Sequence, residues 1–204
     1  MTHRTSQSLL ALFLTLLPVP AMAQTLYSNG PTNGNTDAWT VNLGSIVSDT
    51  FNVAGNDTTI TGATFAMWVL GGVNVDELSI TSSENGGTVY FDQFVNFTQS
   101  GCMLNQYGYD VCNESTTFNG PTLNAGTYWL NLQGCEVPGC AMSYWDENSG
   151  PSQASDNLVG SIPSESFTVF GREATGSVPE PGGALLLGSG IVGLAAGKLR
   201  CKLF

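Results

Sequence analysis

Apolar and polar residues alternate along much of the chain between residues 40 and 171. In the clearest case, Tyr128, Leu130 and Leu132 share one face of an extended strand. This period of two predicts β-strands in a sheet with one buried face. No stretch of residues 24–177 keeps a helical period. The strands expected from the pattern cover residues 48–53, 58–70, 77–81, 88–97, 126–132, 141–145 and 166–170.

Turn-forming residues separate these expected strands, for example at residues 55–57 and 85–87. Several short strands with such turns predict an all-β fold, a β-sandwich that is jelly-roll-like or immunoglobulin-like, with its strand order left open. Residues 149–164 are rich in Ser, Pro and Gly and are expected to form a loop. We expect the core to contain seven aromatic residues: Phe51, Phe65, Trp68, Phe91, Tyr128, Trp129 and Phe167.

The first 23 residues have the order of a secretory signal peptide. Arg4 precedes an apolar core at residues 9–17, and Ala21 and Ala23 form a small-x-small cleavage site. The apolar core is too short to span a bilayer. We therefore expect signal peptidase to cut after Ala23, which makes Gln24 the first residue of the exported protein.

The C-terminal region combines a short polar motif, an apolar run and a basic tail. Sixteen apolar or small residues at 182–197 would span about 24 Å as a helix, against about 30 Å for a bilayer core. The basic residues are Lys198, Arg200 and Lys202, and they favour a cytoplasmic end. The polar motif that precedes the run is Val178, Pro179, Glu180 and Pro181.

This tail resembles the PEP-CTERM sorting signal of Gram-negative bacteria. The resemblance implies that an exosortase, a membrane-embedded cysteine transpeptidase, takes the Pro179-Glu180-Pro181 motif as its substrate. It also implies a host that makes exopolysaccharide or biofilm. We expect a signal peptide at 1–23, an exported domain at 24–171, a linker at 172–177 and the sorting signal at 178–202, with a transmembrane helix at about 182–199. The protein would be exported, held in the membrane until processing, and then found at the cell surface or outside the cell.

Charge and residue types narrow the possible functions. Between residues 24 and 177, fifteen Asp and Glu face a single cation, Arg172, so this region has a net charge of −14. Such a surface repels nucleic acid, whose binding depends on cations. The only histidine is His3, and residues 24–177 contain no Lys. Catalysis through a Ser-His-Asp or Cys-His pair, or through a Lys Schiff base, therefore has no residues to carry it there.

Four cysteines lie in the expected exported domain: Cys102, Cys112, Cys135 and Cys140. An even number in an exported protein predicts two disulfides. Of the three possible pairings we favour Cys102–Cys112 with Cys135–Cys140, because each closes a short local loop. A four-cysteine metal site is the alternative, but the C-x-x-C spacing of structural zinc sites is missing.

The best candidate for ligand binding is the segment Tyr144, Trp145, Asp146, Glu147 and Asn148. Its aromatic rings suit stacking on sugar rings, while its carboxylates and amide suit sugar hydroxyls. Asp146 and Glu147 would also suit calcium, which prefers oxygen ligands. No other cofactor is expected. The alternative is a strand that ends in an exposed polar turn.

Three functions are compatible with the sequence. The first is a non-catalytic protein of the cell surface or extracellular matrix, associated with exopolysaccharide or biofilm. The second is a carbohydrate-binding module that uses Tyr144, Trp145 and Asp146. The third is a glycosidase, which would need two carboxylates facing each other across a cleft.

Overall fold

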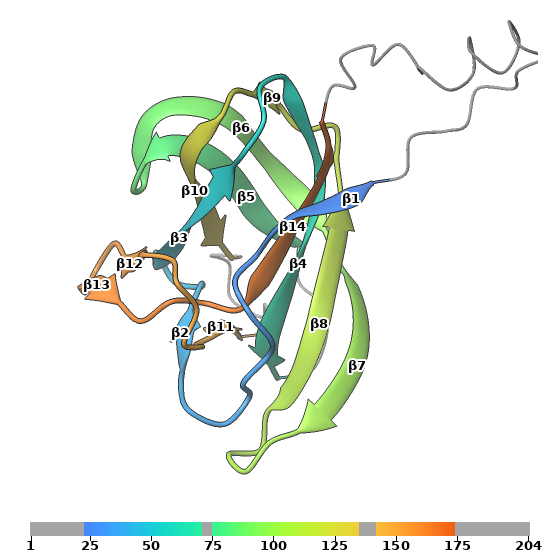
Figure 1. Cartoon of the computed structure of the whole chain (residues 1–204). Coiled ribbons are helices and arrows are strands. Elements are labelled where there is room, and N and C mark those ends of the chain that lie inside the picture. Colours follow the sequence, from blue (N-terminus) through green and yellow to red (C-terminus); the bar gives the residue numbers. More distant parts are fainter. Residues whose placement is uncertain (1–22, 71–74, 135–141, 174–204) are drawn as a thin grey trace, which may run out of the picture.

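The computed structural model describes residues 23–70, 75–134 and 142–173. Within these ranges the chain is all-β, with fourteen strands in two antiparallel sheets and no helix (Figure 1). Among the described residues, no helix has the length and apolar character needed to cross a membrane. The signal peptide up to Met22, the sorting motif at 178–181 and the apolar run at 182–197 lie outside the described residues. Strand β1 begins at Gln24, next to the expected cleavage site.

The larger sheet has eight strands and is built around β4. One edge of β4 pairs with β14 and then with β11, and its other edge pairs with β8 and β9. This arrangement brings chain segments that are more than 100 residues apart next to each other. The strands of this sheet are β1 (Gln24–Ser28), β2 (Ala38–Thr40), β4 (Thr58–Val69), β7 (Thr98–Leu104), β8 (Asp110–Thr117), β9 (Thr122–Leu123), β11 (Ser143–Asp146) and β14 (Phe167–Arg172).

The smaller sheet has six strands in the order β13-β12-β3-β10-β5-β6. Its strands are β3 (Ile46–Val53), β5 (Val75–Ser83), β6 (Gly86–Asn96), β10 (Gly126–Gln133), β12 (Ala154–Asp156) and β13 (Gly160–Ile162). Strands β12 and β13 lie inside the segment 149–164 that was expected to be a loop, so that expectation was wrong there. Their short three-residue runs carry too few apolar positions to reveal a period of two.

One hydrophobic core joins the inner faces of the two sheets. Leu130 and Leu132 of β10 contribute from the smaller sheet, and Phe65 of β4 contributes from the larger one. Five of the seven aromatic residues expected in the core lie in it, while Trp68 is buried on the opposite face of β4. Trp129 is also outside the core, because it lies half-buried on the face of β10 opposite to Leu130.

A pair of carboxylates is also buried between the sheets. Asp76 of β5 and Glu114 of β8 are both almost completely inaccessible to solvent. Both oxygens of Asp76 and one oxygen of Glu114 lack a hydrogen-bond partner, while the other oxygen of Glu114 accepts a bond from Gln99 Nε2 at 3.3 Å. Burial raises the pKa of Asp76 to about 7, and the neighbouring Glu114 adds to the rise. Burial likewise raises the pKa of Glu114 to about 7.

These raised pKa values predict that the fold loses stability as the solution becomes more alkaline. Both carboxyls hold a proton more tightly in the folded state than in the unfolded chain, so their contribution is fully present below pH 4 and is lost as the pH rises through about 7. We expect the thermal midpoint to fall between pH 5 and pH 8, by roughly 5 °C or more. Thermal unfolding followed by circular dichroism measures it.

The double variant Asp76→Asn with Glu114→Gln keeps the size of both groups and removes their titration. Its midpoint should depend less on pH than that of the natural protein. Asp92→Asn, which removes one exposed carboxylate of β6, is the control for the loss of a negative charge. An unchanged pH slope in the double variant would show that this pair does not control stability.

Candidate functional site

The first three residues of the segment Tyr144–Asn148 belong to strand β11, which ends at Asp146, and Glu147 forms an isolated bridge beyond it. Strand β11 pairs with β4 on one side and with β2 on the other. Because side chains alternate along a strand, Tyr144 and Asp146 lie on one face of the sheet, and Trp145 and Glu147 lie on the other. The five residues therefore do not form one ligand-binding group, and each has a different environment.

Trp145 belongs to the core. Its side chain is fully buried, and its ring packs edge-on against Phe65 at 5.2 Å and Phe167 at 5.5 Å. The indole Nε1 donates a hydrogen bond to the carbonyl of Ser166 at 3.0 Å. The expectation that Trp145 stacks on a sugar ring was wrong, because no part of this ring is accessible to a ligand.

Asp146 is a buried structural carboxylate. It accepts hydrogen bonds from the backbone N–H of Asn33 at 2.6 Å, from that of Gly34 at 2.8 Å and from Trp68 Nε1 at 2.6 Å. Burial raises its pKa, while these three donors act in the opposite direction. Both oxygens are engaged and inaccessible, so Asp146 is not free to bind calcium or a sugar hydroxyl as the sequence suggested.

Tyr144 takes part in an open hollow lined by aromatic side chains. The hollow has a volume of about 390 Å³ and lies over β2, β4, β11 and the turn between β7 and β8. We call it the aromatic hollow, and its lining residues are Thr36, Asp37, Ala38, Trp68, Tyr107, Tyr109 and Tyr144. Four rings from three separate regions of the chain therefore meet at one place.

The rings of the aromatic hollow support one another. Tyr107 lies stacked over Trp68, with their ring centres 5.6 Å apart and their planes 22° apart. Tyr109 meets Tyr144 edge-on at 5.4 Å. Trp68 is only 5% exposed beneath its neighbours, whereas Tyr107 is 56% exposed. The outer face of Tyr107 is therefore the most accessible aromatic surface of the hollow.

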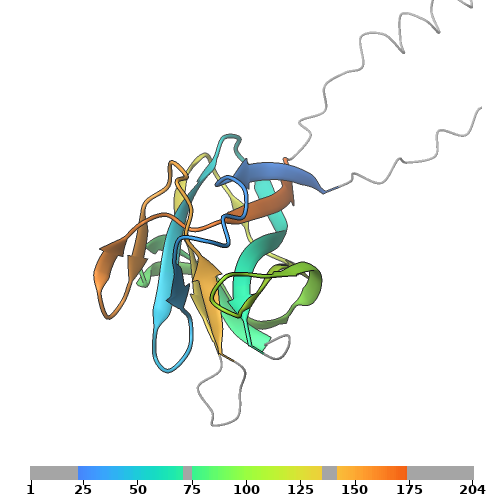
Figure 2. The ribbon, with the colours of Figure 1, turned by 90° about the horizontal axis from the view of Figure 1, so that it is seen from below.

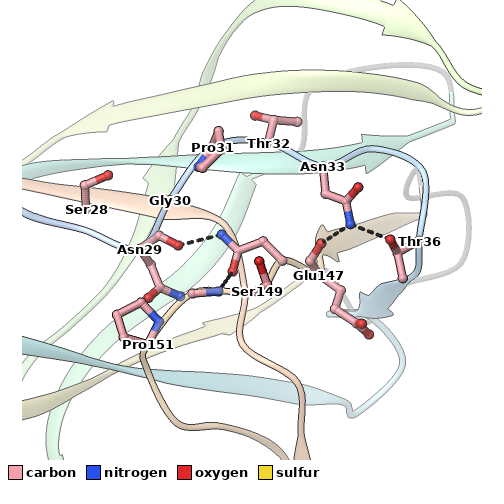
Figure 3. A pocket seen from close by; sticks show the side chains of 12 residues that line it. Ser28, Asn29, Gly30, Pro31, Thr32, Asn33, Thr36, Glu147, Ser149 and Pro151 are labelled. Carbon is pink, nitrogen blue, oxygen red and sulfur yellow. Dashed lines mark hydrogen bonds between the residues drawn. The ribbon is translucent and has the colours of Figure 1, made fainter.

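A second hollow adjoins the aromatic one at Thr36. It has a volume of about 770 Å³ and is lined mainly by amides and hydroxyls, so we call it the amide hollow (Figure 3). The residues that line it are Ser28, Asn29, Gly30, Pro31, Thr32, Asn33, Thr36, Glu147, Asn148, Ser149, Gly150 and Pro151. Asn33 donates from Nδ2 to Thr36 Oγ1 at 2.5 Å and to the Glu147 carbonyl at 3.1 Å, which holds the border between the two hollows.

The sequence identified Tyr144 but missed Trp68, Tyr107 and Tyr109 as site residues. Trp68 was assigned to the core because it falls in a long apolar run. Tyr107 and Tyr109 stand in a polar stretch between two cysteines, and aromatic residues in such a stretch are a signal for an exposed binding surface. Their proximity to Tyr144 depends on β11 and β8 both pairing with β4, which no local pattern reveals.

The turn that carries Tyr107 and Tyr109 is fixed at both ends. Asn105 Oδ1 accepts hydrogen bonds from the backbone N–H of Tyr107 and from that of Tyr109, each at 3.0 Å. A disulfide joins Cys102 of β7 to Cys112 of β8, with their Cα atoms 4.1 Å apart. The predicted Cys102–Cys112 pairing is confirmed. Cys135 and Cys140 lie outside the described residues.

Comparisons with protein-family models, with curated proteins and with solved structures each gave no match. Within the described ranges, no three His, Cys, Asp or Glu side chains are grouped so that they could hold a metal ion. The candidate site therefore rests on the geometry of the two adjoining hollows.

Removal of the Cys102–Cys112 disulfide should loosen the aromatic hollow. The bond closes a loop with a sequence separation of 10 that contains the exposed Tyr107 and the half-buried Tyr109. We expect Cys102→Ser with Cys112→Ala to lower the free energy of unfolding by about 2–3 kcal/mol, since the unfolded chain regains its freedom. Urea denaturation gives this value.

The local effect is measured by amide hydrogen exchange. The amides of Tyr107 and Tyr109 should exchange faster in the variant, while those of β10 in the other sheet should differ only by the overall loss of stability. Equal exchange at Tyr107 in both proteins would mean that Asn105 alone orders the turn.

Proposed function

We propose that this chain is an exported, non-catalytic protein of the cell surface or extracellular matrix. We further propose that its two sheets form a β-sandwich of the jelly-roll-like or immunoglobulin-like kind that binds carbohydrate. The observation that carries the binding proposal is the group of four aromatic rings in the open aromatic hollow, directly beside the amide hollow.

The chemistry of sugars matches these two surfaces. A pyranose ring has a weakly apolar face of C–H groups and a rim of hydroxyls. The exposed ring of Tyr107 offers a flat apolar surface for the face. The Asp37 carboxylate in the same hollow is an acceptor for hydroxyls at the rim. Because the hollows adjoin at Thr36, an extended polysaccharide fits this surface better than a single sugar does.

Charge selects among polysaccharides. The region from residue 24 to residue 177 has a net charge of −14, and Asp37 and Glu147 lie in the hollows themselves. A neutral or cationic polysaccharide meets no repulsion there, whereas an acidic one does. We therefore propose a neutral polysaccharide as the ligand, such as one in the exopolysaccharide of a biofilm.

The positions of the acidic residues favour binding of a polysaccharide over its hydrolysis. A glycosidase needs two carboxylates on either side of the scissile bond. The buried pair Asp76 and Glu114 lies between the sheets and lines neither hollow. Release of reducing sugar from a bound polysaccharide would contradict this part of the proposal.

Replacement of the exposed ring tests carbohydrate binding. We expect Tyr107→Ala to weaken affinity for a neutral polysaccharide about tenfold, because truncation of an exposed aromatic anchor removes most of its contact. Tyr107→Phe keeps the ring and should bind within about twofold of the natural protein. Affinity electrophoresis against soluble glucan, xylan and mannan, followed by calorimetry, gives the constants.

A matched control is Phe94→Ala, which removes an exposed aromatic side chain of β6 in the other sheet, where it lines neither hollow. Its affinity should equal that of the natural protein. Absence of binding to all three polysaccharides, or an equal loss in Phe94→Ala and Tyr107→Ala, would overturn the proposed site.

We propose that two processing enzymes act on the chain. Signal peptidase would cut after Ala23, and an exosortase would act at Val178–Pro181 and thereby free the protein from its membrane segment at about 182–199. Mass mapping of the protein from its host should find Gln24 at the N-terminus and no peptide that contains residues 182–204. A protein that still ends at Phe204 would contradict sorting at this motif.

A further inference from the structure

Glu147 and Glu165 lie directly opposite each other at the edge of the larger sheet, where they form an isolated antiparallel bridge. The hydrogen bonds that flank the bridge run from Asn148 N to Ser164 O and from Ser166 N to Asp146 O, each at 2.8 Å. This is the non-hydrogen-bonded type of pair, in which two side chains extend from the same face and come closest together. Two like charges in that position repel each other.

Asp49 of the smaller sheet lies next to the backbone of Glu165, behind this pair of side chains. Its Oδ2 accepts the backbone N–H of Glu165 at 2.7 Å. Asp49 and Glu165 are both fully buried. Neither carboxylate oxygen of Glu165 has a hydrogen-bond partner. Glu165 is therefore a buried carboxylate with two unused oxygens, and it lies close enough to Asp49 and Glu147 to feel their negative charges.

No basic side chain is at hand to neutralise this charge. Arg172 is the only Lys, Arg or His between residues 24 and 177. It stands seven residues beyond Glu165, at the far end of β14, which corresponds to roughly 20 Å along an extended strand. Within the described residues, the side chain that donates to Glu147 is that of Trp39, whose Nε1 lies 3.4 Å from Oε2. That part of the chain therefore brings no cation to these acids.

We propose that Glu147 and Glu165, with Asp49 behind them, bind one divalent cation of the calcium class. Calcium takes six to eight oxygen ligands, and these are often carboxylates supplemented by amide or backbone oxygens and water. Glu147 also lines the amide hollow, whose wall carries neutral amide and hydroxyl oxygens (Figure 3). Two carboxylates would be the direct ligands, and Asp49 would add charge.

This proposal revises the calcium site suggested by the sequence. Glu147 remains, but Glu165 replaces Asp146, because Asp146 faces the other side of the sheet and accepts three hydrogen bonds. The inference depends on the interior carboxylates and not on the aromatic hollow. The proposed cation site can therefore be wrong while carbohydrate binding is right, and carbohydrate binding can be wrong while the cation site is right.

A proton is the competing occupant. Burial, followed by repulsion from Asp49, Glu147, Asp146 and Asp37, raises the pKa of Glu165 well above its usual value. Burial also raises the pKa of Asp49 to about 6. A protonated Glu165 would relieve the repulsion without a metal ion, so the experiment must separate the two cases.

The test is thermal unfolding of the exported protein at pH 7.5 after removal of metals with EDTA. Addition of 1 mM Ca²⁺ should raise the midpoint by about 4 °C or more, as expected for a ligand that binds only the folded state. Calorimetry should give one ion per chain. In Glu165→Gln both the shift and the bound ion should disappear. In Asp76→Asn, which changes a buried carboxylate elsewhere between the sheets, both should remain.

Two results would overturn the proposal. One is a midpoint that rises when the pH is lowered to 5 but does not respond to Ca²⁺ at pH 7.5, which would assign the site to a proton. The other is an equal Ca²⁺-induced rise of the midpoint in the natural protein and in Glu165→Gln, which would mean that Ca²⁺ acts through the acidic surface and not through this site. Glu147→Gln, at a half-buried position, repeats the test if Glu165→Gln does not fold.

Discussion

The buried carboxylate of Asp146 organises the end of the domain that carries both hollows. Its three hydrogen bonds connect β11 to the loop at Asn33 and Gly34 and to the indole of Trp68. The loop borders the amide hollow, and Trp68 forms the floor under Tyr107. A negative charge is costly to bury unless donors surround it. Here that cost is offset by three N–H groups, and as a result three distant chain segments are held in one arrangement.

Glu165 shows what happens when such donors are missing. It lies two residues before the start of β14 and is as deeply buried as Asp146. Neither of its carboxylate oxygens has a hydrogen-bond donor. The pair Asp76 and Glu114 is in a similar state at another point between the sheets. In most proteins a nearby Lys or Arg would stabilise such groups. This chain has a single cation, Arg172, between residues 24 and 177, so its interior acids depend on protons or ions from the surroundings.

Local patterns predicted the regular strands well and the site poorly. Strands β4 and β10 were recognised because each has a continuous run in which one face is apolar. Strand β7 was missed because all but one of its residues are exposed, so it has no buried face to produce a period. The Cys102–Cys112 pair was predictable because it is local. Trp145 was misplaced because its position depends on pairing with Met67 and Trp39, which are distant in sequence.

The positions of the chain ends have a mechanical consequence. Strands β1 and β14 pair so that Gln24 lies opposite Gly171, and the two ends of the domain leave side by side (Figures 1 and 2). The turn between β7 and β8, which carries Tyr107 and Tyr109, lies at the opposite end of the domain (Figure 1). If the C-terminal end were held and a ligand pulled at that turn, the force would run along β14 and β4. Their hydrogen bonds are perpendicular to the strands, so they would be loaded in shear and share the tension instead of opening one after another.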